Sequence, residues 1–221
     1  MLRSEPTRYG AGITLYGDYY DLRSLHDTIH DLSKGSPLIY SLEEFLLGLA
    51  YDVRHAYQKD RKVETFGSDQ YDQVTYGGVD LLWPIVLVQI RMLRWAAAFH
   101  PTTREHQSNL SRLESCAEQS LKEYDLLIGE KCVEWLNFFN GFPPTYLPEF
   151  ISDVTKKYLF ESKGGKQRFR RLPGILGMVH PMSEEYRAFE EEIRAIAKEK
   201  AASRKNCMIV LNGPNLNGRR K

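Results

Sequence analysis

The chain has 221 residues and a mass of 25.6 kDa, which is the size of one domain with at most a small appendage. Apolar residues make up 42% and charged residues 27% of it, and this average balance excludes a wholly disordered chain and a polytopic membrane protein. The formal net charge of +1 excludes a general electrostatic attraction to nucleic acid or anionic membranes, so binding of that kind would need a local patch of charge.

The first eighty residues predict a small antiparallel sheet with helices between its strands. Ile13–Tyr16 is β-branched and aromatic and follows a glycine-rich turn, which indicates a hairpin. Two further strands are expected at Lys62–Phe66 and Val74–Val79, with a bulge or tight bend at Gly77-Gly78. Apolar residues at helical spacing predict two helices between the hairpin and these strands, the first of them capped by Asp21.

The most apolar run of the chain is Leu81–Phe99, and it predicts a buried central helix. Its length would suit a membrane span, but Arg91 and Arg94 lie inside it, and each would cost roughly 2.5–3.5 kcal/mol at a bilayer centre. A buried arginine needs an anionic ligand or an acidic partner. The favoured interpretation is an internal ion pair with one of three acidic residues, Glu114, Glu118 or Asp80.

Four more helices are expected after residue 100, at about 102–124, 129–139, 148–160 and 183–200. The predicted fold class is therefore mainly α (α+β), with about six helices and a small antiparallel sheet near the N-terminus. We expect one helical domain over residues 1–203 and a C-terminal tail over residues 204–221. Three cysteines without a CxxC pair, and an N-terminus without an apolar signal segment, predict a reduced, cytoplasmic protein.

A basic stretch between Lys156 and Arg171 is the main anomaly of charge. Its seven basic residues face a single acid, Glu161, and Phe160 and Phe169 are interleaved with them. Cations with aromatic rings suit phosphate contacts and base stacking, so nucleic-acid binding is one hypothesis. A solvated loop, or a surface for an acidic partner, is the alternative, and no RNA-binding signature is present. The candidate nucleic-acid or anion-binding residues are Lys163, Lys166, Arg168, Arg170 and Arg171.

The last predicted helix has a narrow apolar seam of two positions in seven, formed by Tyr186, Phe189, Ile193 and Ile196. Acidic residues dominate its first half and basic residues its last turns. A seam of this width suits docking onto a partner helix or self-association. The sequence therefore predicts a non-enzymatic interaction protein with a protein partner or a homo-oligomer, with no cofactor and no membrane partner.

Enzymatic chemistry has a weaker basis in the sequence. His26 and His30 are one helical turn apart and could bind a divalent metal, with Asp52 and His55 as further ligands. The alternative is that both histidines flank the apolar face of their helix and meet nearby acids. No nucleophile elbow, Walker A loop or Cys/His pair at motif spacing is present, so no catalytic residue is assigned. A metal-dependent enzyme stays an alternative function.

Two parts of the chain resemble known families. The body, residues 2–201, resembles a family of uncharacterised bacterial proteins through Gly12–Tyr19, Ser24–His30 and His180–Tyr186, and this resemblance implies no activity. Met208–Asn217 resembles the opening strand and first loop of type II 3-dehydroquinases, which dehydrate 3-dehydroquinate on a flavodoxin-like fold. That resemblance implies that Asn215 would help to stabilise the enolate. The loop with the catalytic tyrosine and arginine of those enzymes has no counterpart before the chain ends, so a dehydroquinase-related enzyme is kept only as an alternative.

Overall fold

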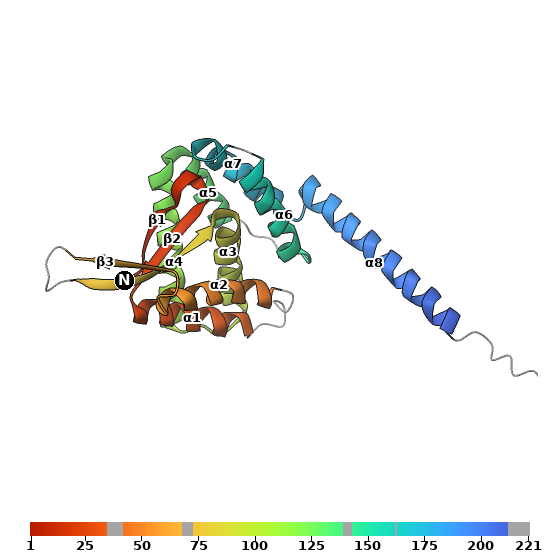
Figure 1. The fold of residues 1–221 in the computed structure, drawn as a ribbon, viewed down its shortest axis with the longest axis horizontal. Coiled ribbons are helices and arrows are strands. Elements are labelled where there is room, and N and C mark those ends of the chain that lie inside the picture. The colour runs from red at the N-terminus through yellow and green to blue at the C-terminus, as the bar shows by residue number, and fades with distance from the viewer. Residues whose placement is uncertain (35–41, 68–72, 139–142, 162, 212–221) are drawn as a thin grey trace, which may run out of the picture.

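The computed structural model describes residues 1–34, 42–67, 73–138, 143–161 and 163–211, with side chains throughout except at Phe138 and residues 201–211. These residues form eight α-helices, rather than about six, and one four-stranded antiparallel sheet built from the N-terminal part of the chain (Figure 1). The predicted fold class, mainly α with a small N-terminal sheet, is confirmed.

The sheet has the strand order β1-β2-β4-β3, and every neighbouring pair is antiparallel. The predicted hairpin is formed by the first two strands, with a short 3₁₀ turn between them, and the strand expected at Lys62–Phe66 has those bounds. The strand expected at Val74–Val79 runs on to Leu82, so Leu81 and Leu82 belong to the sheet and not to the central helix. The strands are β1 (Arg3–Pro6), β2 (Gly12–Gly17), β3 (Lys62–Phe66) and β4 (Val74–Leu82). One face of the sheet is apolar and packs into the core through side chains such as Ile13, Leu15, Val79 and Leu81.

The prediction of a bulge at Gly77-Gly78 is wrong. Both glycines pair in unbroken register with β2 on one side and β3 on the other. Both positions require glycine because atoms of neighbouring residues lie where a Cβ would be. A Cβ at Gly77 would lie 1.8 Å from the carbonyl oxygen of Ala56, and a Cβ at Gly78 would lie 2.4 Å from the ring of Tyr16. Absence of a side chain therefore lets the end of a helix and a tyrosine ring lie directly on β4.

Four helices pack against the sheet, α1 (Tyr19–Lys34), α2 (Glu43–Tyr57), α3 (Trp83–Phe99) and α4 (Arg104–Tyr124), and α5 (Leu126–Phe138) packs against α4. The predicted central helix is α3, and most of its residues are buried. The cap of α1 is Asp18 and not Asp21 as expected, because the side chain of Asp18 accepts a hydrogen bond from the backbone N–H of Asp21 (2.9 Å).

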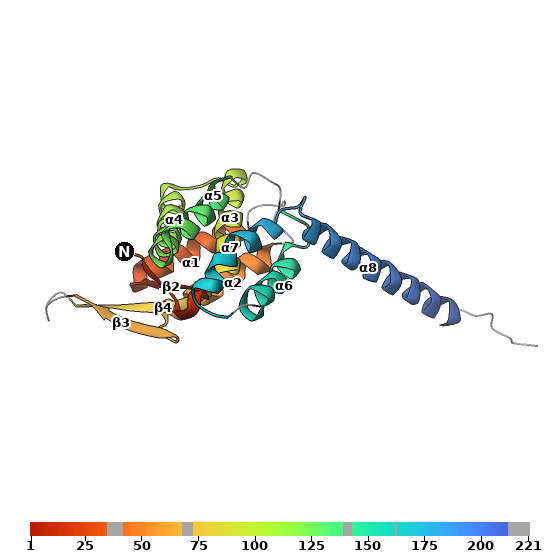
Figure 2. The ribbon, with the colours of Figure 1, turned by 90° about the horizontal axis from the view of Figure 1, so that it is seen from above.

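The C-terminal part consists of α6 (Leu147–Phe160), α7 (Lys166–Met178) and α8 (Glu184–Leu211). Helix α8 projects away from the rest of the molecule in both ribbon views (Figures 1 and 2). Within the residues that the structure describes, no helix has the combination of length and apolar character that a membrane crossing requires.

Candidate functional site

The first half of the predicted seam fixes α8 to the body. The rings of Tyr186 and Phe189 lie 5.3 and 5.1 Å from the ring of Phe150 on α6, measured between centroids. The Tyr186 hydroxyl accepts a hydrogen bond from the backbone N–H of Tyr146 (3.1 Å), and Ser183 caps the helix by accepting one from the N–H of Tyr186 (3.1 Å). These two seam residues therefore serve internal packing.

The second half of the seam lies on the projecting part of α8. Ile193 is half-buried, and Ile196 exposes 41% of its surface. Both follow Phe189 at helical spacing, so the stripe that is buried against α6 at the base of the helix continues beyond the body. The burial of the seam thus decreases along α8, from the anchoring Tyr186 at its base to the exposed Ile196.

The charges of α8 are divided along its length. Residues 184–192 contain five glutamates and one arginine, a net charge of −4. Residues 193–205 contain five basic residues and one glutamate, a net charge of +4. One ion pair joins the halves within the helix, from Arg194 to Glu190 (3.0 Å). The projecting helix is therefore complementary in charge to a second copy of itself that runs in the opposite direction.

The basic stretch is not one loop: Lys156 and Lys157 lie at the end of α6, and the residues from Lys166 onward form the start of α7. Arg168 donates hydrogen bonds to the carbonyl oxygens of Leu159 (2.9 Å) and Tyr9 (3.3 Å), and Arg171 pairs with Glu161 (2.8 Å). These two arginines hold α7 against its neighbours. The other three predicted residues, Lys163, Lys166 and Arg170, are exposed. Phe169 is buried, whereas Phe160 is 82% exposed. Nucleic-acid binding stays a prediction for the three exposed cations.

The histidine pair lies on α1, with ring centroids 4.5 Å apart. His26 Nδ1 lies 2.9 Å from a carboxylate oxygen of Asp27, and His30 Nδ1 is buried without a hydrogen-bond partner among the described residues. Burial, and then the nearby His26, lower the pKa of His30.

The two further ligands that were predicted do not complete a metal centre. His55 Nδ1 instead lies 2.9 Å from a carboxylate oxygen of Asp60, and burial raises the pKa of Asp52. Among the residues with described side chains, no group of three or more His, Cys, Asp or Glu side chains is arranged to hold a metal ion. Metal binding at His26 and His30 stays a prediction that would need a ligand from elsewhere.

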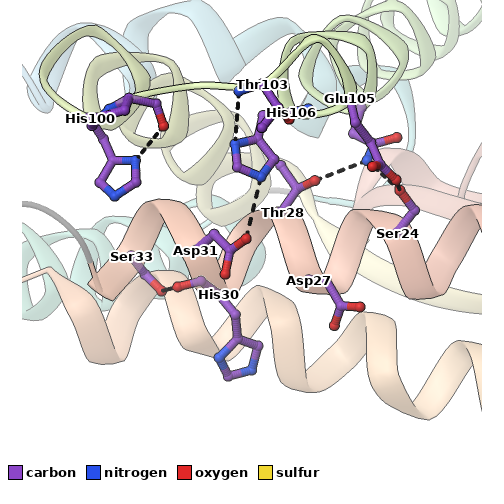
Figure 3. A network of polar contacts seen from close by, with 12 residues as sticks. Ser24, Asp27, Thr28, His30, Asp31, Ser33, His100, Thr103, Glu105 and His106 are labelled. Atoms are coloured by element: carbon purple, nitrogen blue, oxygen red, sulfur yellow. Dashed lines mark hydrogen bonds and ion pairs between the residues drawn. The ribbon is translucent and has the colours of Figure 1, made fainter.

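A polar network fixes α1 to α4 on the side of α1 opposite His30 (Figure 3). Ser24 donates a hydrogen bond to Glu105 (2.6 Å), and the buried amide of Asn109 donates to Ser24 (2.7 Å) and Thr28 (2.9 Å). His106 lies 3.3 Å from Asp31 across the same interface. These contacts use the polar groups to hold two helices together, so the role that they indicate is structural.

Arg94 on α3 confirms the favoured interpretation, an internal ion pair with Glu114. Arg94 forms a two-point contact with Glu114, one arm of which is 2.7 Å, and donates a third hydrogen bond to Gln107 (2.7 Å). The hydrogen bonds to Glu114 are the main cause of the raised pKa of Arg94. This half-buried pair joins α3 to α4 and has the bidentate geometry that makes arginine–carboxylate pairs strong.

One polar constellation was not predicted from the sequence. The outer face of the sheet, which is the face turned away from the core, borders a hollow of about 760 Å³. Titratable side chains from all four strands line it: Glu5, Tyr16, Lys62, Glu64 and Asp80. A sequence signal exists in the alternation of charged residues along Lys62–Phe66, but only the register of the sheet shows that these side chains meet.

Comparisons with known proteins give a family and no function. A family model described as a domain of unknown function (DUF6904) matches residues 2–215. No curated protein and no solved structure matches the chain. The expectation of an uncharacterised family is thereby confirmed for nearly the whole sequence. The dehydroquinase-like residues 208–211 form the end of helix α8 and not a strand, and Asn215 lies outside the described residues.

Proposed function

The chain belongs to the family of the domain of unknown function DUF6904, and we propose that it is a non-enzymatic interaction protein that self-associates through α8. The observation that carries this proposal is the projecting half of α8, on which Ile193 and Ile196 continue an apolar stripe beyond the body. The helix has 28 residues and is therefore about 42 Å long, of which the contacts with Phe150 hold only the base.

A helix of this kind gains stability from a partner. Isolated helices are marginal in water, and most helical stability in proteins comes from packing an apolar face against another element. The described part of the chain buries Tyr186, covers Phe189 and Ile193 in part, and leaves Ile196 exposed. A partner helix that covered Ile193 and Ile196 would extend the same packing along the projecting turns.

The partner that we propose is a second copy of the chain, with the two α8 helices antiparallel. In that arrangement the −4 half of each helix lies beside the +4 half of the other. A parallel pair would place like charges side by side. The antiparallel pair has a two-fold axis, which is the commonest symmetry of homo-oligomers and buries the same patch on both copies. Antiparallel helices also align each helix dipole favourably with its neighbour.

Paired substitutions on opposite faces of α8 test this proposal. Ile193→Asp places a charge on the seam, and we expect it to abolish dimers seen by light scattering. Ala195→Asp, two residues further on and exposed, introduces the same charge on the other side of the helix and should leave the dimer intact. Equal dimerisation by wild type and Ile193→Asp would show that α8 does not mediate self-association.

A further inference from the structure

The outer face of the sheet is curled so that its two edge strands approach each other. Strands β1 and β3 are at opposite edges, yet the guanidinium carbon of Arg3 lies 4.8 Å from the ring centroid of Phe66. Tyr16 is only 2% exposed, although its register position places it on the face turned away from the core. The curl therefore makes a walled hollow from what would otherwise be a flat surface.

Carboxylates from both edges converge on the buried hydroxyl of Tyr16. Its oxygen lies 2.9 Å from a carboxylate oxygen of Glu5 on β1 and 3.1 Å from one of Glu64 on β3. The ring can reach this position because it lies across Gly78. Burial and these two carboxylates raise the pKa of Tyr16, so its hydroxyl keeps its proton. One hydroxyl has one hydrogen, and it can satisfy only one of the two carboxylates.

Two other charges of the hollow are paired with each other. Lys62 lies 2.7 Å from Asp80, and the Thr14 hydroxyl donates a hydrogen bond to the same carboxylate (2.6 Å). Among the described residues, neither Glu5 nor Glu64 has an ion-pair partner. The remaining charged residue of the lining is the exposed Arg8, so the lining as a whole has an excess of one negative charge.

We propose that this hollow binds a primary ammonium group on an alkyl chain, held between Glu5 and Glu64. The two distances to Tyr16 place the carboxylate oxygens no more than about 6 Å apart, which lets one nitrogen donate to both at ordinary hydrogen-bond lengths. An ammonium has three N–H donors and supplies the hydrogens that Tyr16 lacks. Leu82, which has the register of Asp80 and so shares its face, adds apolar surface for the methylene stem.

The volume of the hollow, about 760 Å³, is within the range of small-molecule sites. The same chemistry could come from a free alkylamine or from a lysine side chain of another protein. We therefore titrate the full chain with three probes that carry it: n-butylammonium, spermidine and a short peptide with one lysine. The readouts are calorimetry and the melting temperature, which rises with ligand concentration when the folded state binds the ligand.

Two variants of the glutamates in the hollow and one matched control test whether these carboxylates bind the ammonium group. Glu5→Gln and Glu64→Gln each remove one charged acceptor from an exposed side chain, and each should weaken binding about tenfold or more. Glu130→Gln changes an exposed glutamate on α5, away from the hollow, and should leave binding unchanged. n-Butanol, which lacks the charge, and tetramethylammonium, which lacks the N–H donors, should not bind.

Tighter binding of the lysine peptide than of both amines would assign the hollow to a protein side chain, and the reverse order would assign it to a free amine. Two outcomes would overturn the proposal. One is that none of the three probes binds. The other is that they bind equally well to wild type, Glu5→Gln and Glu64→Gln.

Discussion

Gly77 and Gly174 show how differently two glycines of one chain are constrained. Gly77 lies in β4 beneath the end of α2, where the carbonyl of Ala56 occupies the position of a side chain. Gly174 lies inside α7, and nothing among the described residues approaches within 4 Å of the position that its Cβ would take. The first glycine is required by packing, whereas the second only weakens its helix.

We predict opposite signs for alanine at these positions. Gly77→Ala should destabilise the protein by about 1–3 kcal/mol, because β4 or α2 must shift away from the new methyl group. Gly174→Ala should stabilise it by about 0.5–1 kcal/mol through the better helix propensity of alanine. The midpoints of urea unfolding measure both effects, and a neutral Gly77→Ala would contradict the close approach of α2 to β4.

His30 makes stability depend on pH. Burial and the neighbouring His26 lower its pKa in the folded state, while the unfolded chain keeps a value of about 6.5. Below that pH the unfolded state binds a proton that the folded state resists, so stability falls as the pH falls through this window. Above it both states are neutral at this residue, and His30 contributes no pH dependence.

The variant His30→Gln tests this linkage. It cannot take up the proton, so its urea midpoint should change less than that of wild type between about pH 7.5 and about pH 5.5. The comparison is made within each protein, so a loss of packing that is common to both pH values cancels. An equally large decrease in the two proteins would show that other groups cause the acid sensitivity.

At the scale of the element, α7 and α8 show where sequence patterns succeed and fail. The start of α8 was predicted because Ser183 precedes a clear periodic stripe, and the capping hydrogen bond is present. Helix α7 was missed because Gly165, Pro173 and three further glycines interrupt the pattern of residues 163–178. Its burial against the core through Phe169 and Leu172 overrides this weak propensity.

The division of charge along α8 predicts the orientation of the pair. A swapped variant carries lysine at Glu190, Glu191 and Glu192 and glutamate at Arg194, Lys198 and Lys200. In an antiparallel pair it should self-associate like wild type, because its halves are again complementary. It should not pair with wild type, because like charges would then meet.

Native mass spectrometry of a mixture of the two chains measures this directly. Homodimers of each chain without mixed dimers are the expected result. Mixed dimers in excess of homodimers would instead indicate parallel helices, because only that arrangement places the reversed charges of the swapped chain opposite the wild-type charges.

At the scale of the whole molecule, the fold class could be predicted from the sequence because its signals are local. Leucine stripes, a glycine turn and one long apolar run each specify an element without reference to distant residues. The hollow on the sheet could not be predicted in this way. Glu5 and Glu64 lie on strands that are far apart in the chain, and they meet only through the register of β2 and β4 and the curl of the sheet.

Some of the predicted functional residues are covered by the fold and others are exposed, and the sequence could not distinguish them for a related reason. Spacing on a helix shows which side chains share a face, but it does not show which of them the rest of the fold covers. Tyr186 and Phe189 were covered by Phe150, and Arg168 and Arg171 were drawn into contacts with neighbouring elements. Ile196, Lys166 and Arg170 stayed exposed.

The most direct test of the central proposal is the molar mass of the wild-type chain by light scattering, measured over a range of protein concentrations at low and high salt. Self-association through α8 predicts a mass that approaches twice 25.6 kDa as the concentration rises. Antiparallel pairing predicts that salt lowers this mass by screening the complementary halves. A mass of 25.6 kDa at every concentration and salt condition would contradict the proposal.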